Sequence, residues 1–400
     1  MFRILIIGLF LLSSTHCLAQ DSTALLRDSL VFKGQLITWL NANLANELPL
    51  AAGLRYLPQL NYRLPHTVTA NRTPPTAHRQ PHTAPRLFDL EASANIFAAA
   101  NLRPFDSLNA TGLIKPYRLW VRYSGPQWEI RAGLQKINFG SATLLRPLMW
   151  FDQIDPRDPI QFTDGVWGLL GRYYFLNNAN LWLWGLYGNH QRRGWDLAPT
   201  AKRQPEWGAR FQQPLPKGEM ALSLHYRQAD TRSLEPLVPA HAAAPETRLG
   251  FDVKMDWAVG CWLEASWTAN HRDLGAYRHQ EMLNLGIDYT WGIGNGLYIA
   301  AEQLLVATDA QAFRLARTNS LSLLSLSYPL GFFDNIGAMV YFDWSNNALY
   351  RFVNWRKQWN NGTLFVMAYW NPKNSSLPTQ SSTQNPYSGA GVQIMYLWNH

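Results

Sequence analysis

The chain has 400 residues, of which 13% are aromatic and only 16% are charged, and its formal net charge at pH 7 is +8. It contains no apolar run of the roughly eighteen residues that a membrane-spanning helix needs, which excludes a helical membrane protein. The moderate positive charge favours anionic lipid head groups or solutes as partners and does not indicate nucleic acid.

The first residues have the layout of a secretory signal peptide. Met1-Phe2-Arg3 is short and positively charged, the stretch 4–12 is apolar, and Cys17-Leu18-Ala19 has the small residues of a cleavage site. We therefore exclude residues 1–19 from the fold. The remaining residues, 20–400, contain a single cysteine, Cys261, so no disulfide within the chain is predicted.

The front of the remaining chain is the hardest part to interpret. Residues 32–44 and 51–64 are candidates for one β-hairpin, and residues 88–98 alternate clearly between apolar and polar side chains. Between them, the segment 65–85 is rich in proline, which cannot donate a hydrogen bond to a sheet. We predict that this segment is a periplasmic connection.

Alternation with a period of two then continues to the end of the chain, interrupted by turns rich in Gly, Pro, Asn and Asp. The predicted hairpins pair 117–123 with 128–139, 166–175 with 181–188, 207–212 with 220–227, 249–257 with 261–270, 282–291 with 297–306, 321–328 with 336–344, and 350–358 with 363–370. Residues 388–400 form a last, apolar and aromatic strand. Leu323-Leu324 breaks the alternation and predicts a bulge.

These elements predict an all-β fold, a transmembrane antiparallel up-and-down β-barrel. Short turns within the predicted hairpins alternate with mostly longer, more polar connections between them, as in barrels with short periplasmic turns and long extracellular loops. In hydrocarbon every backbone group must be paired, so the sheet has to close. A soluble propeller would show a blade repeat, and we find none. Including the front hairpin gives about 18 strands, which we favour, and omitting it gives 16.

The alternation also predicts which side chains face the lumen. Leu249, Phe251 and Val253 would face lipid, because a charge there costs about 2–4 kcal/mol at mid-bilayer, and Asp252 and Lys254 would face inward. The same parity predicts a basic patch that lines the pore: Arg118, Arg122, Arg131, Arg172, Arg210, Arg227 and Arg248. Inward carboxylates face it: Asp89, Glu91, Asp252, Asp256, Glu264, Asp288 and Glu302. Two interpretations stay open: an arginine ladder that guides anionic solutes, or a salt-bridged wall that supports the barrel.

The long connection 140–164 is the most unusual part of the chain. Its Arg146–Pro159 stretch carries three prolines and the apolar run Leu148-Met149-Trp150-Phe151, which would be costly in open solvent. We expect it to fold into the lumen, where Asp152, Asp155 and Asp158 would oppose the wall arginines. Together with Arg146 and Arg157 they are the candidate constriction residues. An ordered surface loop is the alternative.

The sequence shows no pattern of catalytic or metal-binding residues. The residues His225, Ser266 and His271 do not form a recognisable nucleophile set, and no His/Cys spacing indicates zinc. We predict no enzymatic activity, no metal and no cofactor.

Three stretches carry a resemblance. They are 117–123, then Arg131-Ala132-Gly133-Leu134-Gln135 running on to Gly140, then Asp155-Pro156-Arg157-Asp158. This pattern, R-x-G-x-Q-x-x-x-x-G followed by D-P-R-D, resembles a motif of Gram-negative outer-membrane β-barrels of the porin-like and polysaccharide-export-like kinds. The resemblance covers about residues 114–190 and implies a barrel in the outer membrane, without naming a substrate.

The sequence therefore predicts an outer-membrane porin-like channel for passive diffusion of small hydrophilic solutes, anionic ones if the arginines guide them. The alternative is a non-transport barrel that acts in surface binding or in envelope and polysaccharide assembly. Outer-membrane lipid is the other expected partner. The sequence does not distinguish a monomer from a trimer, since Trp398-Asn399-His400 replaces the terminal phenylalanine of trimeric general porins.

Overall fold

A computed structural model describes residues 29–44, 49–66, 86–103, 107–373 and 387–400. Eighteen antiparallel strands form one closed sheet in which each strand pairs with the next along the chain. The last strand, β18 (Ala390–Asn399), closes the ring on the first, β1 (Ser29–Asn43), with Trp398 opposite Leu36 and Ile394 opposite Leu40. The prediction of eighteen strands is confirmed, and the alternative of sixteen is wrong.

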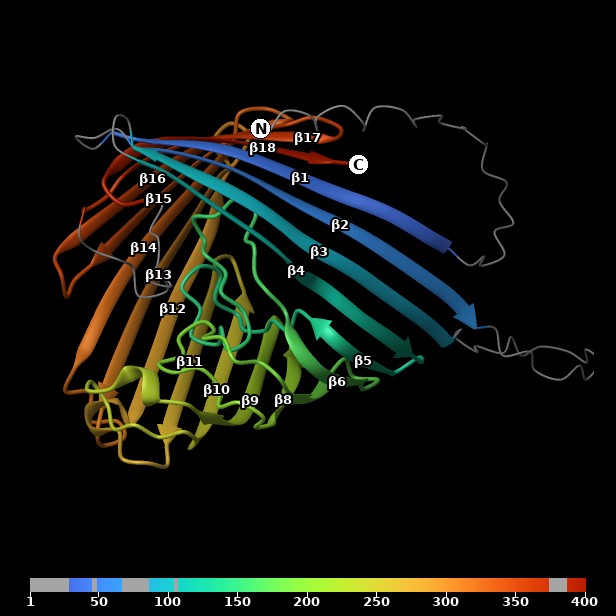
Figure 1. Ribbon diagram of the computed structural model, residues 1–400, viewed down its shortest axis with the longest axis vertical. Helices are drawn as coiled ribbons and strands as arrows, with labels where there is room; N and C mark the ends of the chain where they lie inside the picture. The colour runs from blue at the N-terminus through green and yellow to red at the C-terminus, as the bar shows by residue number, and fades with distance from the viewer. Residues whose placement is uncertain (1–28, 45–48, 67–85, 104–106, 374–386) are drawn as a thin grey trace, which may run out of the picture.

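The strands between these two follow the chain around the barrel (Figure 1). Their bounds are β2 (Leu50–His66), β3 (Arg86–Arg103), β4 (Ser107–Ser124), β5 (Trp128–Gln135), β6 (Val166–Tyr174), β7 (Asn180–Leu186), β8 (Glu206–Leu215), β9 (Gly218–Ala229), β10 (Ala244–Asp256), β11 (Gly260–Asn270), β12 (His279–Trp291), β13 (Leu297–Asp309), β14 (Thr318–Pro329), β15 (Asp334–Asp343), β16 (Ala348–Gln358) and β17 (Gly362–Trp370). Two 3₁₀ turns lie in connections, Arg232–Leu234 and Gly275–Tyr277. The predicted signal peptide and most of the proline-rich segment lie outside the described residues.

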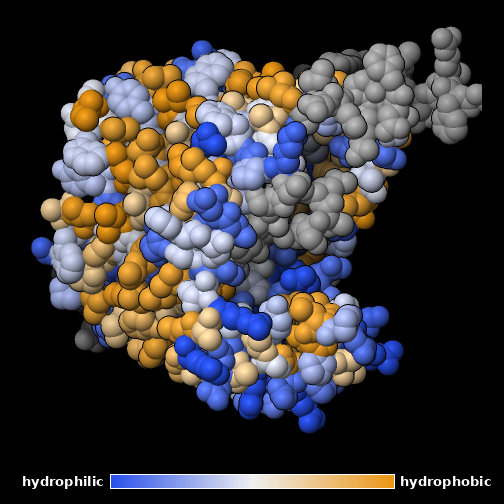
Figure 2. Space-filling view, turned by 90° about the vertical axis from the view of Figure 1, so that its left-hand side faces the viewer, coloured by the Kyte–Doolittle hydropathy of each residue, from blue (hydrophilic) through white to orange (hydrophobic). Residues whose placement is uncertain are grey.

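The outer wall is apolar because of the predicted alternation. On β10, Leu249 and Phe251 are exposed on the outside, whereas Asp252, which follows Phe251, is buried toward the lumen. Apolar side chains spread over the outer surface of the later strands (Figure 2). Aromatic side chains such as Trp257 and Trp344 stand exposed at strand ends, the level of the lipid head groups. No helix among the described residues is long and apolar enough to cross a membrane.

The lengths of the strands differ around the ring. β3 and β4 have 18 residues each, whereas β5, β6 and β7 have 8, 9 and 7. The prediction that the strand beginning at Trp128 runs to Phe139 is wrong, because β5 ends at Gln135. Gly133 adopts a φ of +119°, and a Cβ there would lie 2.1 Å from the backbone oxygen of Leu119. The chain then leaves the wall, and Phe139 turns into the interior.

The predicted bulge at Leu323-Leu324 is also wrong. The pairing register of β14 with β13 and with β15 continues through Leu323 and Leu324 without a shift. Leu324 is exposed on the outer face, as expected from the alternation of side chains along the strand. Leu323 points inward and is buried in an apolar cluster with Leu304 and Tyr350. The inner wall is thus apolar here, because an inserted loop packs against it.

Candidate functional site: the lumen and its inserted loops

The connection between β5 and β6, residues 136–165, lies inside the ring of strands (Figure 1). We call it the inner loop. Its backbone is held by two buried carboxylates of the opposite wall. Glu264 on β11 accepts hydrogen bonds from the N–H of Ala142 at 2.8 Å and of Leu148 at 2.6 Å. Glu302 on β13 accepts three more from consecutive residues, 143 to 145. Hydrogen bonds to a charged acceptor are among the stronger ones in proteins.

Apolar side chains of the inner loop fill the space next to this anchor. Trp150 and Phe151 are buried and pack on Phe139 and Trp184. Trp150 also donates its indole N–H to the Ser266 hydroxyl at 3.1 Å. The absence of a side chain at Gly250 of β10 leaves room for Leu148 of the inner loop, since a Cβ at Gly250 would lie 2.4 Å from a methyl group of Leu148.

The charged residues of the inner loop pair mainly with one another. Arg146 meets Asp152 at 3.2 Å and donates to the backbone oxygen of Phe139 at 2.8 Å. Burial raises the pKa of Asp152 above its ordinary value, and the charge of Arg146 offsets part of this rise. Arg157 holds Asp155 through two hydrogen bonds of 2.8 and 2.6 Å.

The third aspartate, Asp158, accepts hydrogen bonds from the backbone N–H groups of Ile160 and Phe162. Burial raises its pKa, and these two hydrogen bonds partly counteract the rise. Contrary to the expectation from the sequence, no aspartate of the set 152, 155 and 158 forms an ion pair with an arginine of the predicted wall patch, among the described residues. Asp152 and Asp155 pair with arginines of the loop itself, and Asp164 at the end of the loop pairs with Lys115 of β4 at 2.6 Å, so these charges position the loop.

The structure divides the predicted basic patch in two. Arg122, Arg131 and Arg172, on three adjacent strands, remain 16–25% exposed and gather around Glu129 at 3.4, 3.7 and 3.1 Å. Arg122 also meets Asp89 at 2.5 Å. The rings of Trp120 and Trp182 support two of them, with the Arg131 guanidinium 4.6 Å and the Arg172 guanidinium 3.7 Å from the ring centroids. We call these three arginines the wall cluster. It lies near the periplasmic ends of β4, β5 and β6.

The other four arginines of the patch are buried and engaged. Arg118 donates to the backbone oxygens of Tyr117 and Thr163. Arg210 forms a pair of hydrogen bonds with Asp252 at 2.6 and 3.0 Å. Arg227 and Arg248 both bind Glu246, with closest contacts of 2.6 Å. Arg210, Arg227 and Arg248 make a salt-bridged wall, whereas Arg118 joins β4 to the inner loop through the backbone oxygen of Thr163.

A second inserted loop was not recognised in the sequence. Residues 187–205 follow β7, and their Asp196 accepts from Arg227 at 2.9 Å and from Arg248 at 2.6 Å. Arg193 of the same loop meets Glu206 at 2.6 Å. The sequence signal is present only as charged residues inside a long connection, and these resemble an ordinary surface loop until their wall partners are known.

No group of three or more His, Cys, Asp or Glu side chains suited to hold a metal ion occurs in the part of the chain that the structure describes.

Comparison with known proteins supports the fold. No protein-family model matches the chain, and no curated protein matches it. Among solved structures it is similar to OccK5 (OpdH) of Pseudomonas aeruginosa, with a TM-score of 0.54, 10% identity, and coverage of 93% of this chain and 97% of that one. It is also similar to OccAB4 of Acinetobacter baumannii, with a TM-score of 0.53, 9% identity, and coverage of 93% and 98%. At this identity the likeness shows the fold, which is a closed antiparallel barrel of the porin-like, outer-membrane type.

Proposed function

We propose that the protein is an outer-membrane channel through which small hydrophilic solutes diffuse, anions in preference to cations. The wall cluster is the observation that carries the anion preference. Four guanidinium groups, of Arg63 and the wall cluster, share two carboxylates, Asp89 and Glu129. With the neighbouring Glu91 counted as well, the arginines still outnumber the carboxylates by four to three.

Permanent charge and partial exposure suit this cluster to anion passage. Arginine stays protonated at every physiological pH and binds carboxylates and phosphates through two parallel hydrogen bonds. Stacking on Trp120 and Trp182 keeps the guanidinium groups extended along the wall. Because Glu129 is shared among three arginines, no single guanidinium is fully neutralised, and an anion passing the wall meets net positive charge.

The experiment is single-channel recording in a planar bilayer with a salt gradient across it. The unmodified protein should give a reversal potential of anion preference. Arg131→Gln should lower the anion-to-cation permeability ratio by a factor of about two to five. Arg351→Gln is the matched control, because this exposed arginine lies on the outward parity of β16 near its extracellular end. A cation preference, or equal effects of both substitutions, would contradict the proposal.

A second candidate function is a non-transport barrel that acts in surface binding or in envelope assembly. The five backbone hydrogen bonds from the inner loop to Glu264 and Glu302 favour it, because they fasten the loop across the lumen. Absence of conductance from correctly folded protein would support this candidate over the channel.

A further inference from the structure

The outer wall carries an apolar depression over strands β7 to β14, with its upper edge on the extracellular half and a cavity volume of about 730 Å³. Its upper edge is one row of outward, cross-strand neighbours: Ala209, Leu224, Leu249, Trp267, Glu281 and Ala307. In the next row, the small Ala265 stands between Phe251 and Leu283, so the floor is recessed between larger side chains. The shape is a slot for a slender apolar group.

The connection between β13 and β14, residues 310–317, folds down over this depression on the outside of the barrel. Phe313 and Leu315 adopt φ values of 60° and 54°, a left-handed conformation that is uncommon for residues other than glycine. The N–H of Phe313 donates to Glu281 at 3.0 Å, and its ring lies 5.4 Å from that of Trp267. Phe313 is nevertheless 67% and Leu315 53% exposed. Strained backbone thus holds two apolar side chains at the rim, where they lack partners for most of their surface.

Three polar atoms at the same rim are buried without a hydrogen bond. They are the indole nitrogen of Trp267, Nδ1 of His279 and the second carboxylate oxygen of Glu281. All three side chains lie on the outward parity of neighbouring strands, and the ring of Trp267 stacks on that of His279 with centroids 6.0 Å apart. Buried polar groups normally find a partner. The indole N–H of Trp267 is suited to donate to an oxygen of a ligand, whereas the Glu281 oxygen is suited to accept from a hydroxyl or ammonium group of the ligand.

Unpaired positive charge surrounds the upper end of the depression. Arg314 and Arg317 belong to the overhanging connection, and Arg272 and Arg278 to the neighbouring one between β11 and β12. All four are exposed, and within the described ranges none forms an ion pair. The aspartates next to them, Asp273 and Asp309, accept backbone hydrogen bonds from Gly275 and Gln311.

We propose that this depression is a binding site for an anionic, phosphate-bearing lipid of the outer leaflet, one that carries net negative charge. The acyl chain would lie in the slot between Phe251 and Leu283, with Phe313 and Leu315 against it, and the phosphate would meet Arg314 and Arg317. The vertical order matches a bilayer, since the apolar slot lies below the strand ends and the cations lie at head-group level. Each arginine near a membrane surface adds appreciable attraction for anionic lipid.

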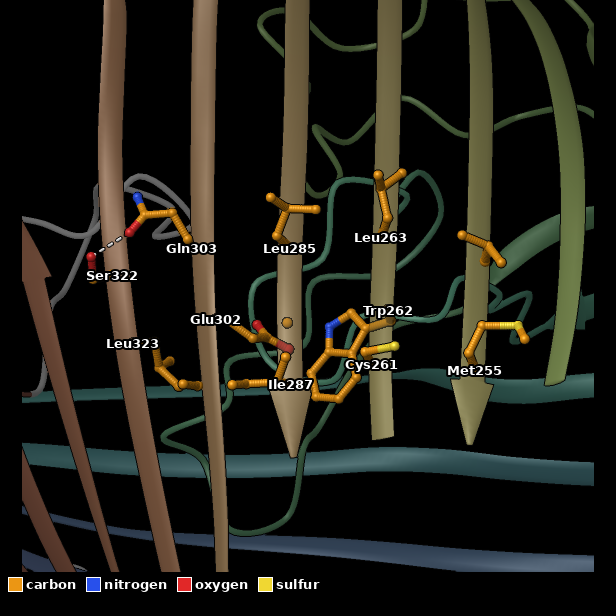
Figure 3. Close-up of a pocket in the computed structure, with 13 residues that line it drawn as sticks. Met255, Cys261, Trp262, Leu263, Leu285, Ile287, Glu302, Gln303, Ser322 and Leu323 are labelled. Carbon is orange, nitrogen blue, oxygen red and sulfur yellow. Dashed lines mark hydrogen bonds between the residues drawn. The ribbon is translucent and has the colours of Figure 1, made fainter. Parts of the chain in front are cut away.

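A neighbouring depression provides an internal comparison (Figure 3). It lies nearer the periplasmic ends of β10 to β14, has a cavity volume of about 600 Å³, and is lined by Cys261, Leu263, Leu285 and Ile287. Its outward polar groups bind each other, Ser322 donating to Gln303 at 2.5 Å. Because these two outward groups are already paired with each other, they are not available to bind a head group.

The experiment measures lipid retention by the full chain in non-ionic detergent, using native mass spectrometry. The probes are dimyristoylphosphatidylglycerol, which is anionic, and dimyristoylphosphatidylcholine, which has the same chains and no net charge. The unmodified protein should bind the anionic lipid more tightly. The double variant Arg314→Gln/Arg317→Gln should weaken this binding by about tenfold or more. Lys202→Gln/Arg203→Gln, which removes the same charge from two exposed residues of the second inserted loop, away from the depression, should leave it unchanged.

The apolar half of the proposal is tested separately. Ala265→Phe should fill the slot and reduce retention of the anionic lipid, whereas Ala301→Phe, an outward alanine in the neighbouring depression, should not. Inorganic phosphate should not compete, since it lacks the chains. Equal binding of the two lipids, or equal effects of a variant and its control, would overturn the proposal. Heat-modifiable mobility on gels verifies that each variant has folded.

Discussion

The backbone N–H of Leu145 donates to Glu302 at 2.5 Å, and so joins the middle of the inner loop to the far wall of the barrel. The same carboxylate accepts from the N–H groups of Thr143 and Leu144 at 2.9 and 3.0 Å. Glu302 is buried and points into the lumen from the centre of β13. One side chain thereby fixes three consecutive peptide groups, which a loop cannot satisfy by itself in that position.

Glu302→Ala should therefore loosen the inner loop. The change leaves three N–H groups without their acceptor, which should cost about 2–4 kcal/mol of docking free energy. Hydrogen exchange of peptides covering residues 141–148 should become faster. Glu219→Ala removes an exposed carboxylate next to a periplasmic turn and serves as control. Unchanged exchange in the Glu302 variant would show that the apolar packing alone holds the loop.

Deletion of residues 147–158 should raise the single-channel conductance. The deletion removes the buried Trp150 and Phe151 together with the Asp152 and Arg157 ion pairs, so space opens inside the barrel. Conductance in planar bilayers measures the effect. Replacing residues 311–316, which lie outside the barrel wall, with a short Gly-Ser linker should leave conductance unaltered. Equal conductance of the deletion variant and the unmodified protein would show that the inner loop does not narrow the channel.

The alternation of apolar and polar residues predicted the strands well, because the lipid-facing side of each strand has to be apolar. It placed Asp252, Glu264 and Glu302 inward, and all three are buried on the lumen side. It did not reveal that these carboxylates accept hydrogen bonds from the inner loop or from buried arginines. Such partners lie more than a hundred residues away in sequence for Glu264 and Glu302, and strand periodicity carries no information at that range.

The apolar inner wall was missed for a related reason. Leu304, Tyr341 and Tyr350 face inward, where a water-filled lumen predicts polar residues, yet they are fully buried. They pack in a cluster with Leu145 of the inner loop. An inward apolar residue is interpretable only when the element that covers it is known, and the sequence places that element 150 or more residues earlier in the chain.

Asp152→Asn should change how loop docking depends on pH. Burial raises the pKa of Asp152 in the folded protein. The contribution of this carboxyl group to the free energy of loop docking is therefore fully present at a pH below the ordinary aspartate pKa, and it is lost as the pH rises through the raised pKa. Arg146 and Lys136, the cations that act on this carboxylate, remain in the variant. Raising the pH from 4 to 7 should therefore weaken docking more in the unmodified protein than in the variant. Hydrogen exchange of residues 141–148 at both values measures this difference, and identical pH profiles would contradict it.

Arg227→Met should destabilise the barrel more than the loss of any exposed arginine. Arg227 is fully buried and lies 2.6 Å from Glu246 and 2.9 Å from Asp196, which belongs to the second inserted loop. Methionine keeps much of the side-chain volume but removes the charge. Among the described residues, Arg248 is then the one cation that still contacts both buried carboxylates, Asp196 and Glu246. Breaking a buried pair in this way costs about 3–5 kcal/mol.

Equilibrium unfolding in denaturant, with the protein in detergent, gives the free energy of unfolding for this variant. Arg232→Met is the control, because its pair with Asp230 is exposed and should contribute less than about 1 kcal/mol. The second inserted loop should also become accessible to protease in the Arg227 variant, since Asp196 loses one of its two anchors to the wall. Equal stability of the two variants would mean that apolar packing and Arg248 hold this loop, and that the buried network adds little to the barrel.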